Sequence, residues 1–204
     1  MLYVEQSLTA GEKILHVGRF HWIYVVSALF WLVLGFVLCI AILTGGFTWD
    51  VRTDMQAAYP NLPAHLFWEG WARVVDSRGG YIAVIRETPL GIKMAGFGAL
   101  LVGVVLFAQM MIVRATTEIA VTNKRLVIKE GVIARRVDEM DIDHIESVHV
   151  WQSVLGRLLD YGVVMVRGMG VGEISLPALA HPVILRKSIE NAKYVSEAAK
   201  ARVH

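Results

Sequence analysis

The stretch WIYVVSALFWLVLGFVLCIAILT, residues 22–44, decides the fold class, because its 23 residues include no charged side chain. A second stretch, MAGFGALLVGVVLFAQMMIV, covers residues 94–113 and lies between Lys93 and Arg114. About 20 apolar residues are enough for a helix to cross the hydrocarbon core of a bilayer. Both stretches are therefore predicted to be transmembrane helices. The first is longer than the apolar core of a signal peptide, so we expect it to be retained as an anchor.

The composition of the whole chain agrees with a membrane protein. Of its 204 residues, 55% are hydrophobic and 19% are charged, whereas soluble domains have about 45–50% and about 25%. This composition excludes a disordered chain, which would be poor in hydrophobic residues. The net charge of +2 gives no support to a nucleic-acid partner. The single cysteine, Cys39, excludes an internal disulfide and a cysteine-based zinc cluster.

Two spans would place both ends of the chain on the same side of the membrane. Six Lys and Arg residues lie near the spans on the side of the termini, and five lie in the connecting segment. Because positive residues are more frequent on the cytoplasmic side, this small difference favours cytoplasmic termini. Residues 1–21 would then form a cytoplasmic N-terminal arm, and residues 45–93 would form an extracytoplasmic connector.

The connector includes one segment with an amphipathic pattern, around Pro63–Val75. Five apolar residues there fall near one face of a helix: Leu66, Phe67, Trp71, Val74 and Val75. Such a helix would either lie on the outer membrane–water boundary or belong to a loop with a small cap.

Small residues recur along the second span. Gly91, Ala95, Ala99 and Gly103 are spaced four residues apart, and stripes of small residues allow membrane helices to approach closely. This stripe would pack against the first span of the same chain or against another copy.

From Thr116 onward the pattern changes to alternating apolar and polar residues, which is typical of half-exposed antiparallel strands. Strands are predicted at 116–122, 125–130, 132–138, 144–151, 161–167 and 171–176. Asn123-Lys124 and Glu130-Gly131 are predicted to be tight turns, because Asn and Gly tolerate a positive φ. A helix is predicted from Pro182, with Leu185, Ile189, Ala192, Val195 and Ala199 on one face. The fold class is therefore α+β, with a curled antiparallel sheet capped by a C-terminal helix.

Four segments carry a family resemblance. They are LTAGEKILHVGRFHW (Leu8–Trp22), TTEIAVTNKRLVIKEGVIARR (Thr116–Arg136), DHIESVHVWQSVLGRLLDYG (Asp143–Gly162) and ISLPALAHP (Ile174–Pro182). Together the sequence resembles the bacterial pleckstrin-homology-like (YdbS-like) membrane proteins, which have two transmembrane helices followed by a PH-like domain. The resemblance implies a PH-like domain over residues 114–204 and a location in the bacterial inner membrane. The 49-residue connector departs from the short turn usual in this family.

The sequence contains no pattern typical of an enzyme or a metal site. None of its seven histidines has the i,i+4 spacing of helical metal ligands, and no Walker A, HExxH or G-x-S-x-G motif occurs. The glycines of Gly168–Gly172 are not followed by a helix, as a dinucleotide site would require. We therefore expect no catalysis, no metal, no cofactor and no small-molecule substrate.

A basic cluster and an aromatic residue are the candidate binding residues. The cluster consists of Lys124, Arg125, Lys129, Arg135 and Arg136. Basic residues near an anionic leaflet each contribute about 1 kcal/mol of attraction. Eukaryotic PH domains bind inositol phosphates through the loop between their first two strands. If the predicted strand that begins at Thr116 is taken as the first strand, its connection to the second strand is only Asn123-Lys124.

Two functions remain open at this point. In the first, the domain is an interaction module that docks a partner protein or its own copies at the membrane, with Trp151 and residues 153–161 as anchors, because aromatic side chains dominate binding hot spots. In the second, the hairpin Lys124–Arg136 senses anionic lipid headgroups. The expected partners are membrane lipids and a protein or a second copy.

Overall fold

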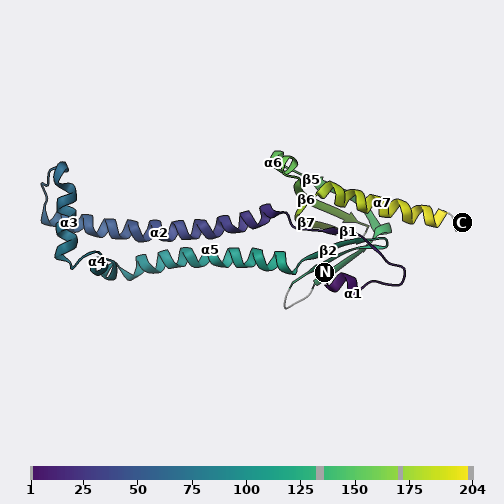
Figure 1. The fold of residues 1–204 in the computed structure, drawn as a ribbon, viewed down its shortest axis with the longest axis horizontal. Coiled ribbons are helices and arrows are strands. Elements are labelled where there is room, and N and C mark those ends of the chain that lie inside the picture. Colours follow the sequence, from purple (N-terminus) through teal and green to yellow (C-terminus); the bar gives the residue numbers. More distant parts are fainter. Residues whose placement is uncertain (1, 132–135, 170–171, 202–204) are drawn as a thin grey trace. The chain divides into compact units, whose positions relative to one another are not determined.

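The computed structural model describes residues 2–131, 136–169 and 172–201 (Figure 1). It divides into two compact units. One unit is the central segment Ala28–Ala108, and the other combines Met1–Ser27 with Gln109–His204. The central unit is helical, whereas the strands all lie in the other unit.

The central unit contains most of two long helices, α2 (Trp22–Ala58) and α5 (Leu90–Thr116). Both are long and apolar enough to be candidate membrane spans, and they include the two stretches predicted from the sequence. Helix α2 continues past residue 44, because no proline occurs before Pro60. Phe47, Val51 and Met55 extend an apolar face along this continuation. The first part of the predicted connector is therefore helical.

The rest of the connector folds as a small cap against the end of α2. It consists of a 3₁₀ turn (Ala64–Leu66), α3 (Phe67–Ser77) and α4 (Tyr81–Glu87). Val75 is buried with Val51 and Met55 in a small core, so the apolar face predicted for this segment points into the cap. The Arg78 guanidinium lies 3.0 Å from the Asp50 carboxylate of α2. This arrangement matches the interpretation of the segment as a small cap.

Helices α2 and α5 are in contact through glycine. A Cβ atom built on Gly35 would lie 2.9 Å from the Ala99 carbonyl oxygen and 2.9 Å from Gly103 Cα, so the two backbones touch. Ala99 and Gly103 of the predicted stripe lie at this contact, whereas Gly91 and Ala95 are exposed. Because four residues turn a helix about 40° past a full turn, the stripe winds about 120° around α5 between Gly91 and Gly103. Only its later half can face α2.

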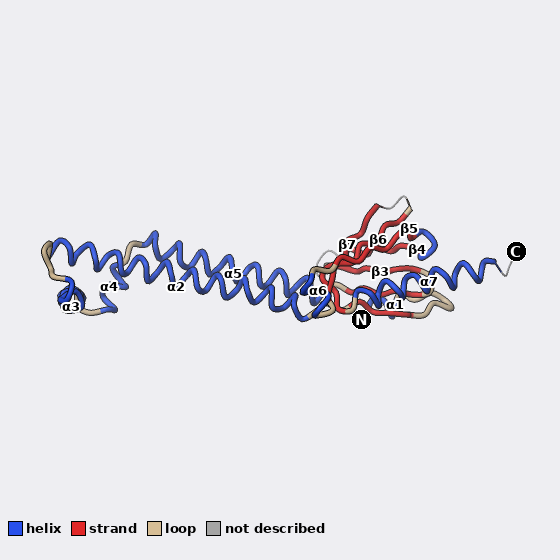
Figure 2. The backbone as a smooth tube through the Cα atoms, turned by 90° about the horizontal axis from the view of Figure 1, so that it is seen from above, coloured by secondary structure: helices blue, strands red, loops and turns tan. Residues whose placement is uncertain are grey.

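The other unit contains two antiparallel sheets and a C-terminal helix (Figure 2). The four-stranded sheet has the order β1 (Ile14–Gly18), β2 (Glu118–Thr122), β3 (Arg125–Glu130) and β4 (Arg136–Asp141), and the three-stranded sheet has the order β5 (Ile145–Trp151), β6 (Tyr161–Gly168) and β7 (Gly172–Ala180). The helices are α1 (Leu2–Gln6), α6 (Val154–Leu158) and α7 (Pro182–Ala201). The single curled sheet expected from the sequence is thus two sheets, separated at a 3₁₀ turn between β4 and β5.

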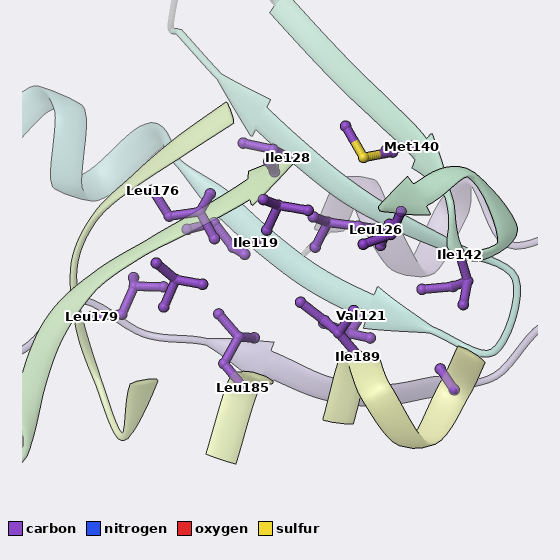
Figure 3. Close-up of a cluster of buried hydrophobic side chains, with 14 residues drawn as sticks. Ile119, Val121, Leu126, Ile128, Met140, Ile142, Leu176, Leu179, Leu185 and Ile189 are labelled. Carbon is purple, nitrogen blue, oxygen red and sulfur yellow. The ribbon is translucent and has the colours of Figure 1, made fainter. Parts of the chain in front are cut away.

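Both sheets and α7 contribute to one hydrophobic core (Figure 3). Ile119 of β2, Leu176 and Leu179 of β7, and Leu185 and Ile189 of α7 are all fully buried there. On β2 and β3, every second side chain points away from this core to the opposite face of the sheet. On that face these side chains are buried together with Val4 of α1. The predicted C-terminal helix is confirmed, and it closes the core.

The N-terminal arm belongs to this unit. Strand β1 pairs with β2 in the register Val17↔Ala120 and Gly18↔Ile119, and α1 covers the outer face of the same sheet. The chain from α2 to α5 is therefore inserted between the first two strands. From the sequence, residues 1–21 are predicted as a separate arm and the domain is predicted to begin at residue 114, because the strand that pairs with β1 follows only after α5.

A buried ion pair fastens the arm to the turn between β2 and β3. The Glu12 carboxylate accepts hydrogen bonds from Arg125 Nε (3.0 Å) and Nη2 (3.1 Å), from the Thr122 hydroxyl (2.8 Å), and from the N–H and hydroxyl of Thr9 (both 2.9 Å). The Glu12 side chain is fully buried. Burial alone would raise the pKa of Glu12, but these hydrogen bonds outweigh it and lower the pKa from 4.5 to about 2.

The Asn123-Lys124 turn forms as predicted, but by another mechanism. Asn123 does not adopt a positive φ. Instead, the Thr122 hydroxyl accepts a hydrogen bond from the Lys124 N–H (3.2 Å). The Asn123 carboxamide accepts from the Lys13 N–H (2.8 Å) and donates to the Gly11 carbonyl (3.2 Å). The asparagine therefore binds the arm.

The glycine contact predicts that Gly35→Ala lowers the free energy of unfolding in detergent by roughly 1–3 kcal/mol, because the added methyl group overlaps the backbone of α5. Gly98→Ala on α5 is the matched control, since its Cβ would meet no atom within 4 Å. The unfolding free energies of both variants are measured by chemical denaturation monitored by circular dichroism. Equal stability of the two variants would contradict the contact.

The Glu12 pKa predicts a pH-dependent stability. Because the pKa is lower in the folded state, the stabilisation is complete above about pH 4.5 and is lost as the pH falls towards 2. We expect Glu12→Gln to remove about 3 kcal/mol of unfolding free energy at pH 7, and the difference from the parent to shrink over this window. Glu146→Gln, at an exposed position, is the control. A difference that does not vary with pH would contradict the lowered pKa.

Candidate functional site

The basic residues predicted to bind lipid are engaged with other groups of the domain. Lys124 Nζ donates to the Ala10 carbonyl (2.9 Å) and Lys129 Nζ lies 3.4 Å from Glu118. Arg136 Nε lies 3.0 Å from Asp138.

Arg125 is the most extensively paired member of the cluster. Besides Glu12, it contacts the Glu139 carboxylate (2.6 Å) and the Ser7 carbonyl (2.7 Å). Arg135 lies outside the described residues. The described members of the cluster thus stabilise the arm and the sheet and form no continuous unpaired basic face.

The connection between the first two strands also differs from the expectation. Because β1 is part of the sheet, this connection is the whole helical segment from Arg19 to Thr117, and Asn123-Lys124 joins the second and third strands. The connection between the first two strands of this unit therefore includes the two candidate membrane spans.

A groove runs between β5 and α7. Its volume is about 770 Å³. It is lined by Ser147, Val148, His149, Val150, Trp151, Met165, Arg186 and Glu190. On its floor, Val148 and Val150 pack against the domain core but stay partly accessible. On its α7 side, Arg186 and Glu190 form an ion pair of 2.7 Å.

Strand β5 is an edge strand of its sheet. Among the described residues it pairs with β6, and no second strand pairs with its other side. His149 lies opposite Met165, and Trp151 lies opposite Val163. Trp151 is 76% exposed. An open edge with a groove of mixed apolar and polar lining beside it can accept an extended peptide, whose backbone supplies hydrogen bonds and whose side chains fill the groove.

The described residues offer no group of three or more His, Cys, Asp or Glu side chains placed to hold a metal ion. Two histidines have carboxylate partners: His181 Nδ1 lies 2.5 Å from Asp160, and His144 Nδ1 lies 3.6 Å from Asp141. Both pairs are exposed.

Trp151 is predicted as a binding residue from the sequence, but the groove beside it is not. Val148 and Val150 gave no signal of their own, because alternating apolar residues are expected in any strand. The groove forms because α7 lies beside β5. The strand order leaves one edge of β5 without a paired strand.

The chain was compared with known proteins. No curated protein and no solved structure matches it. The family described as bacterial PH domain matches residues 77–193, which include β2 to β7 and the first half of α7. Domains of this kind bind lipids or proteins. Since the match covers more than half of the chain and includes six of the seven strands described above, the chain belongs to the bacterial PH domain family.

Proposed function

We propose that this chain is a membrane-anchored, non-catalytic interaction module that docks an extended segment of a partner protein, or of its own copies, at the cytoplasmic face of the bacterial inner membrane. The single observation that carries the proposal is the open edge of β5 beside the β5–α7 groove. Helices α2 and α5 would supply the anchor.

The topology proposed here has both termini and the PH-like domain in the cytoplasm and the α3–α4 cap outside. The contact between α2 and α5 supports it, because a Cβ on Gly35 would meet Gly103 and one on Gly96 would meet Leu43, as in an antiparallel pair. An antiparallel pair of spans returns the chain to the side on which it began.

The groove suits a protein ligand better than a lipid headgroup. Its lining combines the apolar side chains of β5 and β6 with the polar side chains of Ser147 and His149. Its one arginine, Arg186, is paired with Glu190. A headgroup sensor would instead need free cationic groups, and the described basic residues of the Lys124–Arg136 hairpin have carboxylate or carbonyl partners. We therefore favour protein docking over lipid sensing as the proposed function.

Cysteine labelling tests the topology. In a Cys39→Ala background, we expect a membrane-impermeant maleimide to label Ser77→Cys on the connector from the outside of sealed cells. Glu197→Cys on α7 should react only after permeabilisation. Both positions are exposed. The reverse pattern would place the domain outside and would end the proposal of cytoplasmic docking.

Photo-crosslinking tests the docking edge. A photoreactive side chain at His149 should form one defined adduct in native membranes, whereas the same group at Tyr194, an exposed position on α7 that does not line the groove, should not. With the adduct partner purified, Trp151→Ala should weaken binding by about 2 kcal/mol, or about 30-fold. An adduct from Tyr194 alone, or unchanged affinity in Trp151→Ala, would contradict docking at this edge.

A further inference from the structure

Helix α6 is a short turn held rigidly by the small and polar residues of the segment QSVLGRLLDYG. The Ser153 hydroxyl accepts a hydrogen bond from the Gly156 N–H (3.0 Å) and caps the helix. The Gln152 carboxamide donates to the Gly156 carbonyl (3.3 Å) and the Tyr161 carbonyl (3.1 Å). A Cβ on Gly156 would lie 2.7 Å from the Tyr161 carbonyl oxygen. Asp160 ends the turn with a φ of 55°.

This rigid turn presents apolar side chains to the outside. Val154 is 85% exposed, Leu155 is 61% exposed and Leu158 is 78% exposed. Arg157 is exposed among them and has no carboxylate partner within the described part of the chain. A loop that only connected β5 to β6 would gain nothing from three exposed aliphatic residues in five positions, so they point to an apolar partner.

The partner is indicated by what lies beside α6. Tyr161, which directly follows the turn, stacks on His21 with ring centroids 5.2 Å apart, and His21 immediately precedes Trp22, the first residue of α2. The Ala180 N–H donates to the Arg19 carbonyl (2.8 Å), which fixes the start of α2 to the end of β7. Figures 1 and 2 both place α6 at the end of the domain where α2 begins.

We infer that α6 is an interfacial membrane element that lies in the headgroup region near the start of α2, with Val154, Leu155 and Leu158 among the acyl chains and Arg157 at the phosphates. The inference rests on the proposed membrane anchor. The proposed lipid-facing surface of α6 adjoins Trp22. This residue is an exposed aromatic residue of the kind that lies at membrane boundaries. Apolar residues with an adjacent arginine match the composition of interfacial helices.

Lipid-quenching fluorescence tests the inference on the full chain. An environment-sensitive fluorophore is attached to Val154→Cys or Leu158→Cys in a Cys39→Ala background, in nanodiscs of phosphatidylethanolamine and phosphatidylglycerol. Both positions are exposed, so the substitutions should leave the fold unchanged. We expect emission at shorter wavelength than from Tyr194→Cys, which is 73% exposed on α7. We also expect a loss of intensity when nitroxide-labelled lipid is included.

A probe at Val33→Cys in α2 separates failure of this inference from failure of the anchor. Quenching at residue 33 without quenching at 154 and 158 would overturn the interfacial role of α6 and leave the anchor intact. Absence of quenching at all three positions would overturn both. A shift to shorter wavelength at 154 without quenching by labelled lipid would place α6 against protein, and would also overturn the lipid contact.

Discussion

The buried pair of Glu12 and Arg125 is the constraint on which the domain depends, because it joins two segments that the chain separates by the whole helical insertion. Closing so long a connection costs conformational entropy. The insertion reduces this cost, since α2 and α5 pack as an antiparallel pair and return the chain towards its starting point. The pair then selects the register of β1 against β2, and every oxygen of the buried carboxylate has a donor.

This placement of the helices determines which surfaces are left for binding. The connection between β1 and β2 is the helical segment with the candidate spans and not a short loop. The basic residues of β3 and β4 are used for cross-strand and arm contacts. Across the described residues, the combination of an open strand edge and a sizeable groove occurs at β5 and α7. Fold membership alone would not have identified this side, because members of a fold differ in their sites.

The sequence allowed prediction of features whose signals are local. Uncharged runs gave both long helices, alternation gave most strands of the domain, and Pro182 with its apolar repeat gave α7. Features that depend on distant partners were missed. Nothing near Glu12 indicates that Arg125 will neutralise it, and β1 is followed in the sequence by α2 and not by a neighbouring strand that would mark it as part of a sheet. The stripe on α5 meets α2 at Ala99 and Gly103, because a spacing of four residues drifts around a helix whose partner contact follows a spacing of seven, as between Gly96 and Gly103.

The anchor changes what a weak membrane contact can accomplish. A free domain with three apolar side chains on one short turn would bind a bilayer only transiently, since stable anchoring needs larger apolar area or a second signal. In the proposed topology the candidate spans hold the domain at the surface, so the same contact would become intramolecular and would be favoured by a high effective concentration. The contact of α6 would then set the orientation of the domain and would have no role in bringing the domain to the membrane. Because Trp151 ends β5 and α6 begins at Val154, an α6 fixed in the headgroup region would also fix the direction of the β5 edge. A partner segment would then meet that edge in one defined orientation relative to the membrane.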